Sequence, residues 1–287
     1  MNLLCKKIGF PKDAANYIHS VYNGITHNNM AFKELLSAKN SFLSPTSTEY
    51  KKCIRRIHEE IGINIYTINL ILVLACAKNV KTLYDKNGIS EKVYFDTMCD
   101  ISLKLQECKK LYDIWGIFNL DWYRGIFTLQ TFKLGRLEYE IMPCPFDSYK
   151  DYAKKGDIIY RCYIPSDGPL TPESVIDSLK YAFKFFGIKD KLIVYCKSWL
   201  IYPEHYQLFP KGSNLRAFYD LFDITDRELS KSNENLWRIF YKPADTPVDR
   251  LPSNTTLQRN FKEYLRKGNY IGIGTGMLVF DGEKVIK

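Results

Sequence analysis

The stretch that decides the fold reads Asp157-Ile-Ile-Tyr-Arg-Cys-Tyr-Ile-Pro-Ser-Asp-Gly-Pro-Leu-Thr-Pro-Glu-Ser-Val175. Its first half predicts a β-strand over 157–164 that breaks at Pro165 and turns through the following Ser-Asp-Gly-Pro segment. Thr171 can cap a helix, and Pro172 suits the first helical position, where a missing N–H costs nothing. The stretch therefore predicts a strand, a glycine-containing loop and a helix, in that order.

The loop has a chemical consequence, because a helix N-terminus presents free backbone N–H groups that can hold a phosphate. The predicted helix carries apolar residues at helical spacing and stops at Gly187, and a second apolar strand follows over 191–199. This order of elements is common, so on its own it makes phosphate binding one interpretation among several.

The first 115 residues are predicted to be helical throughout. The expected helices cover 13–22, 32–38, 46–61, 65–78 and 90–115. Thr46 and Glu49 have the spacing of a capping box at the start of the third of these helices. Apolar stripes on such helices are usually core faces, so we expect an all-helical domain over 1–115.

Period-two alternation replaces the helical pattern after Gly116. Two strands, 126–132 and 136–142, are expected to form a hairpin around a turn at Gly135. Further on, the expected elements are strand 157–164, helix 172–186, strand 191–199, helix 213–222, strands near 223–229 and 236–241, helix 256–267 and a final hairpin at 281–282. The fold class is therefore α+β, with a mixed α/β domain over 116–287.

Composition and charge narrow the class of protein. The chain has 287 residues, is 46% hydrophobic and carries a formal charge of +9, which is spread over both halves. A spread excess suits a solvated surface or an anionic small ligand better than a nucleic-acid footprint. The apolar run 61–77 is too short to cross a bilayer and predicts a buried helix, so no membrane partner is expected.

The eight cysteines form no Cys-x-x-Cys pair, and no histidine stands at ligand spacing from them. They are expected to be buried free thiols in a reducing compartment, which favours a cytoplasmic protein without a metal site. No secretory leader is evident at the N-terminus.

One strand face carries candidate acid–base chemistry, because Arg136, Glu138 and Glu140 alternate along it. A carboxylate whose pKa is raised by a neighbour can act as a general base. The alternative is a solvated strand face with an internal ion pair.

Other patterns exclude several enzyme classes. Ser198 lacks a nucleophile elbow and an evident His–Asp partner, so a hydrolase triad is not supported. The 211–214 segment lacks the spacing of a P-loop and is expected to be an ordinary helix cap. The glycines of 272–276 lie too close to the C-terminus for a dinucleotide fold.

Five short motifs, taken together and in order, resemble those of a known family. They are Leu134-Gly-Arg-Leu-Glu-Tyr-Glu140, Ile164-Pro-Ser-Asp-Gly-Pro-Leu170, Cys196-Lys-Ser-Trp-Leu200, Pro210-Lys-Gly-Ser-Asn214 and Thr255-Thr-Leu-Gln-Arg259. The chain is similar to bacterial acyltransferase-domain proteins that join a helical N-terminal domain to a GNAT-like C-terminal domain. The resemblance implies transfer of an acyl group from acyl-coenzyme A to a small-molecule acceptor, usually an amine, without a metal.

The resemblance also implies positions for the co-substrate. The pantetheine arm would enter between splayed strands, here 157–164 and 191–199, and the next loop would hold the pyrophosphate. The implied cofactor-binding residues are Ile164, Ser166, Asp167, Gly168, Leu170, Thr171 and Lys197. Backbone N–H groups around Ile164 would polarise the thioester carbonyl.

For the chemistry, the resemblance implies that Glu140 is the general base, with Glu138 beside it. Tyr163, Tyr202 or Tyr219 would be the acid toward the departing thiolate. This chain has one loop glycine, Gly168, where GNAT loops usually have more.

It also has Tyr163 and Lys197 where the resemblance leads us to expect histidine. An inactive module that binds acyl-coenzyme A or another phosphorylated metabolite is therefore the alternative. Nucleic-acid association through the net charge is a third interpretation, which steep salt dependence would support. The acceptor, the acyl chain length and the oligomeric state stay open.

Overall fold

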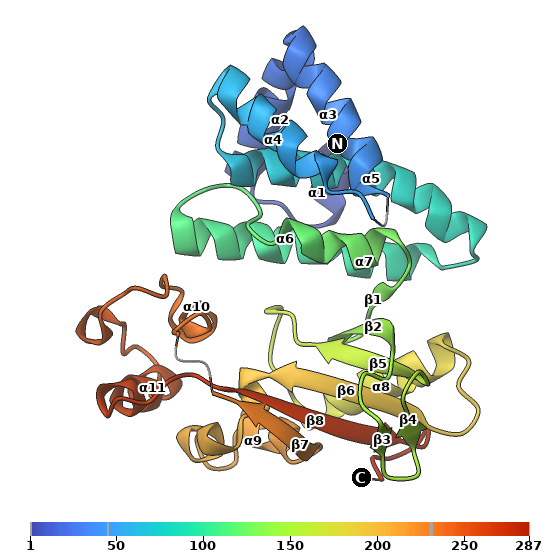
Figure 1. Cartoon of the computed structure of the whole chain (residues 1–287), viewed down its shortest axis with the longest axis vertical. Coiled ribbons are helices and arrows are strands. Elements are labelled where there is room, and N and C mark those ends of the chain that lie inside the picture. Colours follow the sequence, from blue (N-terminus) through green and yellow to red (C-terminus); the bar gives the residue numbers. More distant parts are fainter. Residues whose placement is uncertain (1, 45, 230–231, 287) are drawn as a thin grey trace. The chain divides into compact units, whose positions relative to one another are not determined.

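The computed structural model describes residues 2–44, 46–229 and 232–286. The chain divides into two compact units, Met1–Lys133 and Leu134–Lys287. The first unit is helical, and the second is built around a mixed sheet (Figure 1). The predicted α+β class is thereby confirmed.

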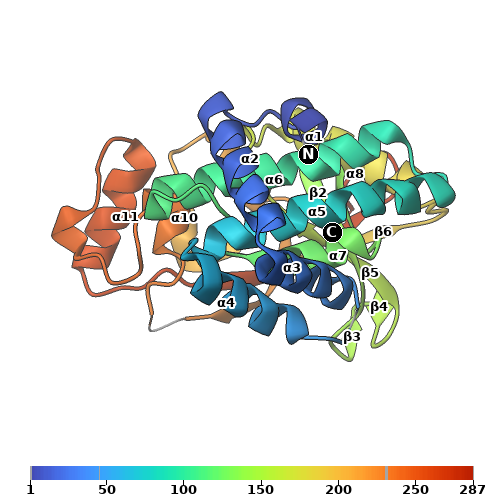
Figure 2. The same ribbon diagram turned by 90° about the horizontal axis from the view of Figure 1, so that it is seen from above.

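The helical unit is organised around one central helix, α5. Its elements are α1 (Asn2–Lys7), α2 (Lys12–His27), α3 (Asn29–Phe42), α4 (Glu49–Ile61), α5 (Ile65–Lys86), α6 (Glu91–Tyr112), η1 (Leu120–Trp122) and α7 (Tyr123–Phe127). α5 contacts α2, α3, α4, α6 and α7, and it runs beside α6 (Figure 2). α5 is also long and apolar enough to cross a membrane, a property that buried core helices share, and 61% of its most apolar window is buried.

The start of α4 differs from its predicted form. The capping box of Thr46 and Glu49 is wrong, because α4 begins after Thr48 and the Thr48 side chain makes no capping bond. The Oγ of Ser41, at the end of α3, instead accepts a hydrogen bond from the Tyr50 N–H at 2.9 Å. A side chain from the preceding helix thus satisfies a free donor of the first turn of α4.

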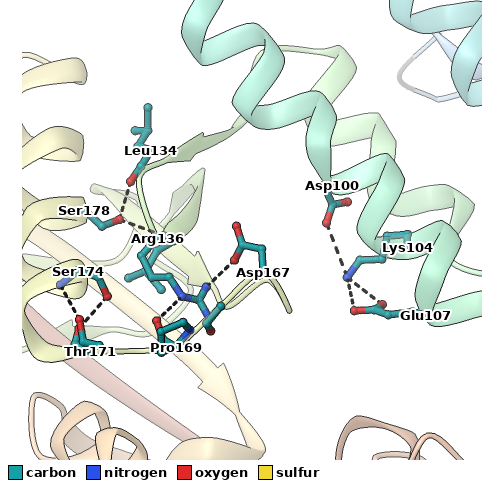
Figure 3. A network of polar contacts seen from close by, with 12 residues as sticks. Asp100, Lys104, Glu107, Leu134, Arg136, Asp167, Pro169, Thr171, Ser174 and Ser178 are labelled. Atoms are coloured by element: carbon teal, nitrogen blue, oxygen red, sulfur yellow. Dashed lines mark hydrogen bonds and ion pairs between the residues drawn. The ribbon is translucent and has the colours of Figure 1, made fainter. Parts of the chain in front are cut away.

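The segment that follows α6 packs back onto the helical unit. Trp122 Nε1 and the Tyr123 hydroxyl donate to Asp100 Oδ2 of α6 at 2.9 and 3.1 Å. Burial raises the pKa of the Asp100 carboxyl, and Lys104, one turn further on at 3.7 Å, opposes this (Figure 3). Because these bonds hold η1 and α7 against α6, the compact unit extends to Lys133, beyond the boundary expected at residue 115.

The second unit contains a mixed sheet with the strand order β1-β2-β5-β6-β8-β7 (Figure 1). The strands are β1 (Thr131–Leu134), β2 (Leu137–Pro143), β5 (Ile158–Tyr163), β6 (Leu192–Ser198), β7 (Asp223–Glu228) and β8 (Ile273–Phe280). β3 (Ser148–Tyr149) and β4 (Ala153–Lys154) form a separate short hairpin. β5 and β6 are parallel, whereas the pairs β2–β5, β6–β8 and β7–β8 are antiparallel.

The helices of this unit follow β5, β6 and β7. They are α8 (Pro172–Phe185), η2 (Trp199–Ile201), η3 (Pro203–Leu208), α9 (Asn214–Tyr219), α10 (Leu236–Phe240), η4 (Val248–Arg250) and α11 (Thr256–Arg266). α8 covers one face of the sheet, where Tyr160 stacks on Phe186 at 4.3 Å. Since strand neighbours alternate, Ile159 and Tyr195 point to the other face, into a core that includes Tyr149 of the β3–β4 hairpin.

Two predicted strands differ from the structure, one at its start and one in full. The segment 126–132 is helical at its start, because α7 runs to Phe127 and β1 begins only at Thr131. The segment 236–241 forms α10 (Leu236–Phe240), and the residue after the helix, Tyr241, caps it in the left-handed conformation. Both segments are rich in aromatic residues, which favour strands in isolation, but burial of one helical face overrides that preference.

Candidate active site

The loop between β5 and α8 enters the helix as its sequence predicts. The Thr171 hydroxyl accepts a hydrogen bond from the Ser174 N–H at 3.2 Å, and Pro172 occupies the first helical turn. The Ser174 hydroxyl donates back to the Thr171 carbonyl at 2.8 Å. α8 has fourteen residues, so its dipole and its free N–H groups make this end suitable for an anion.

The side chain of Arg136 binds the main chain of this loop (Figure 3). Its Nε donates to the Pro169 carbonyl at 3.1 Å, its Nη2 to the Gly168 carbonyl at 2.9 Å, and its Nη1 to Asp167 Oδ1 at 3.0 Å. The Arg136 side chain is only 10% exposed, and this desolvation lowers the pKa of its guanidinium although Glu138 opposes the shift. The sequence grouped Arg136 with the strand carboxylates, but the structure assigns its hydrogen bonds to the loop.

The Arg136 contacts orient the peptide groups of the loop. In a trans peptide the carbonyl and the next N–H point in opposite directions, and the described chain has no cis bond. The Pro169 carbonyl faces Arg136, so the Leu170 N–H faces away from it. Gly168 has φ +143°, where a side chain is strained, and no atom would lie within 4 Å of a Cβ there. A ligand can therefore approach the loop backbone closely.

Ser178 fixes α8 against the β1–β2 hairpin. Its hydroxyl donates to the Leu134 carbonyl at 2.5 Å and accepts from the Leu137 N–H at 3.1 Å (Figure 3). Gly135, in the turn, has φ +75°, and a Cβ there would lie 3.3 Å from the Ser178 Cα. Glycine at this turn lets α8 and the hairpin approach closely. The β5–α8 loop leads into α8, so the hairpin also helps to fix the position of this loop.

The two central parallel strands, β5 and β6, run toward the same edge of the sheet, and β5 leads directly into this loop. The β5–β6 register pairs Tyr160 with Val194, Arg161 with Tyr195, and Cys162 with Cys196. Both strands continue beyond the last of these pairs, β5 to Tyr163 and β6 to Ser198. The last pair lies one residue before the end of β5, and the splaying that the sequence predicts beyond it stays a prediction.

Acid–base side chains gather on the sheet face opposite α8. Glu138 lies across from Tyr163 and Glu140 across from Arg161 in the β2–β5 register, so all four share that face. The Tyr163 hydroxyl donates to Glu140 Oε2 at 2.5 Å. Burial raises the pKa of Tyr163, and the hydrogen bond that its hydroxyl donates to the Glu140 carboxylate raises it further. Tyr163 therefore keeps its proton at neutral pH.

The two carboxylates differ in access. Glu138 is 2% exposed, whereas Glu140 is half-buried. A substrate amine can therefore reach Glu140 more readily, which agrees with its predicted role as base. The catalytic roles of Glu138, Glu140 and Tyr163 stay predictions.

The other predicted residues have different surroundings. Lys197, expected to bind an anion, donates to Glu228 Oε1 of β7 at 2.6 Å. Tyr202 packs against buried His205, with ring centroids 4.7 Å apart, and Tyr219 packs against Tyr206. Burial raises the pKa of both tyrosines. Tyr163 is the tyrosine that the structure brings together with Glu140.

The described ranges contain no group of three or more His, Cys, Asp or Glu side chains suited to a metal ion. The eight cysteines are free thiols.

Arg161 was missed by sequence reasoning, because the register that sets it opposite Glu140 is visible only in the folded sheet.

A mixed sheet whose central parallel pair leads into a capped helix is the architecture of a GNAT-like domain. Residues 131–278 match the GNAT-like C-terminal domain, and residues 1–129 match the N-acyltransferase N-terminal domain. The chain therefore belongs to the family that joins these two domains, which confirms the resemblance found in its motifs. No curated protein matches the chain.

Solved structures share the fold over nearly the whole chain. One is an acyltransferase mutant in complex with octanoyl-CoA, with a TM-score of 0.76 and 17% identity. Another is an acyltransferase in complex with decanoyl-CoA and teicoplanin, with a TM-score of 0.75 and 17% identity. Each alignment covers 96% of this chain and 86% of that chain. At this identity the likeness establishes the fold.

Proposed function

We propose that this protein transfers an acyl group from acyl-coenzyme A to the amine of a small-molecule acceptor. The observation that carries the proposal is the loop between β5 and α8, whose main chain Arg136 holds at the end of a parallel strand pair. The pyrophosphate would bind the loop N–H groups of Ser166–Thr171, and the pantetheine arm would enter between β5 and β6. Structures of the same fold hold octanoyl-CoA or decanoyl-CoA, which supports a medium-length acyl chain.

The reaction would use the Glu140–Tyr163 pair as a proton relay. The neutral amine attacks the thioester carbonyl carbon, whose oxygen receives a hydrogen bond from the Ile164 N–H. Glu140 accepts the amine proton as the C–N bond forms. The C–S bond then breaks, the thiolate takes the Tyr163 proton, and Tyr163 recovers a proton from Glu140 through their 2.5 Å hydrogen bond. Amide and free coenzyme A leave, and the pair returns to its starting state.

A non-catalytic acyl-coenzyme A binding module is the second candidate. The same hydrogen bond favours it, because Glu140 must release Tyr163 before it can accept another proton through that oxygen. In that case ligand binds without release of the free thiol.

Thermal unfolding with and without octanoyl-CoA tests the proposal. A ligand that binds only the folded state adds about 2.7 kcal/mol at 100 times its Kd, which raises the Tm measurably. Thiol release in the presence of an amine then separates enzyme from binding module. Unchanged melting with coenzyme A, octanoyl-CoA and decanoyl-CoA would exclude both candidates.

A cytoplasmic location also belongs to the proposal. The eight free cysteines, most of them buried, suit a reducing compartment.

A further inference from the structure

Arg161 is a guanidinium that the proposed reaction does not use. It lies in the middle of β5. The Cζ atom of its guanidinium is 4.8 Å from the centroid of the Tyr163 ring and 5.9 Å from the centroid of the Tyr195 ring. Its Nε is buried without a hydrogen-bond partner. Within the described ranges the guanidinium makes neither a hydrogen bond nor an ion pair, so its contacts are ring faces.

This absence of a partner contrasts with the other site groups on the same face. Glu140, directly opposite on β2, accepts from the Tyr163 hydroxyl, and Lys197 is paired with Glu228. Arginine presents five donors in a planar fork that matches a carboxylate in two-point fashion. An uncommitted fork beside a proposed general base points to an anionic group on the molecule that the base deprotonates.

We infer that Arg161 binds a carboxylate of the acceptor, and that the acceptor is an amine with that carboxylate on a neighbouring carbon, as in an α-amino acid. The inference rests on the proposed function. Opposed residues of antiparallel strands have Cα atoms roughly 4.5–5.5 Å apart. The amine nitrogen and carboxylate carbon of an α-amino acid are roughly 2.5 Å apart, given standard bond lengths. One such molecule can therefore place its amine at Glu140 and its carboxylate at Arg161.

The first experiment compares two ligands that differ only in the inferred group, N-octanoylglycine and N-octanoylglycinamide. Their Kd values are measured by titration calorimetry in the presence of coenzyme A, so no turnover is needed. The acid should bind roughly tenfold or more tightly than the amide to the wild type, because a charge-assisted pair replaces a neutral contact. Glycine should likewise exceed glycinamide as an acceptor in thiol release from octanoyl-CoA.

Variants assign the preference to Arg161. Arg161→Gln should abolish the acid-over-amide ratio while leaving the Kd of octanoyl-CoA unchanged, and Arg161→Lys should keep part of the ratio. Arg216→Gln is the matched control, because Arg216 also stacks on a tyrosine ring, Tyr206, at 4.8 Å but is committed to the Phe209 carbonyl. The control should retain the full ratio whatever its effect on the Tm.

The outcomes separate the inference from the proposed function. If wild type binds octanoyl-CoA but treats acid and amide alike, or binds neither, the carboxylate assignment is overturned and the proposed function stands. If Arg161→Gln weakens octanoyl-CoA binding and leaves the ratio intact, Arg161 belongs to the co-substrate site instead. If octanoyl-CoA does not bind at all, both fall together.

Discussion

Glu140 and Tyr163 form a pair in which one proton donor and one acceptor are already in contact. The proton of a buried tyrosine is hard to remove, since burial raises its pKa, so Tyr163 can pass it to a thiolate only as Glu140 returns a proton to the phenol oxygen. The amino-acid composition pointed to neither residue. The alternation of β2 located Glu140, and only the family resemblance drew attention to Tyr163.

We predict that Glu140→Gln lowers kcat by about 100-fold or more, the contribution usual for a positioned general base. The Kd of octanoyl-CoA should stay within twofold of the wild-type value, because Glu140 does not belong to the loop. Thiol release measures the first quantity, and calorimetry measures the second.

A second carboxylate serves as control for that substitution. Glu263 on α11 is exposed and pairs with Arg266 and Lys267, so Glu263→Gln should leave kcat unchanged. Wild-type turnover in Glu140→Gln would remove Glu140 from the mechanism and favour unassisted attack by the amine.

The loop between β5 and α8 is an element whose shape depends on a neighbouring element. Arg136, just before β2, holds the carbonyls of Gly168 and Pro169, so the loop is ordered before any ligand arrives. Fixing the backbone of one residue costs about 1–2 kcal/mol of conformational entropy. Because this loop is already ordered, ligand binding does not carry that cost.

We predict that Arg136→Ala raises the Kd of octanoyl-CoA roughly tenfold, the factor that corresponds to ordering about one residue upon binding. The preference for acid over amide should not change. Calorimetry of wild type and variant measures the shift.

Arg124 supplies the matched control for Arg136. It also donates to two backbone carbonyls of a loop, those of Ser44 and Ser47, but in the helical unit. Arg124→Ala should lower the Tm about as much as Arg136→Ala does, and it should leave the Kd of octanoyl-CoA unchanged. Equal losses of affinity in both variants would mean that general stability, not loop order, sets the Kd.

Local signals predicted some elements well and others poorly. Thr171 and Pro172 predicted the start of α8 correctly, because capping depends on residues within one turn. α10 was predicted as a strand, because six residues rich in aromatics show no clear period. The Arg136 contacts and the β2–β5 register escaped prediction, since both join residues well beyond one helical turn or one tight hairpin in sequence.

At the scale of the whole molecule, a buried histidine couples stability to pH. His205 is fully buried among aromatic rings, and this burial lowers its pKa to about 4. An unfolded histidine has a pKa near 6.5, so between these values the unfolded chain binds more protons than the folded one. His205 therefore contributes its full stability above pH 6.5 and loses it as the pH falls toward 4.

We predict that this effect lowers the free energy of unfolding by about 2 kcal/mol between pH 7 and pH 5. Urea denaturation at both pH values measures the loss. His205→Gln keeps a donor for the Trp199 carbonyl, which His205 Nδ1 contacts at 2.8 Å, but cannot titrate.

His205→Gln should therefore show a pH dependence weaker by that same amount. An identical pH dependence in wild type and variant would mean that other groups, such as the carboxyl of Asp281 with its lowered pKa, dominate the acid response.

The edge strand β7 has a consequence for the behaviour of the protein in concentrated solution. An open sheet edge offers unpaired backbone groups to a second copy, which is a common start of aggregation. β7 carries Asp226, Arg227 and Glu228 in exposed positions, and a register irregularity with β8 lies beside them. Alternating charges and an uneven edge discourage strand-to-strand association, so this border of the sheet protects the colloidal stability of a molecule that is otherwise rich in aromatic residues.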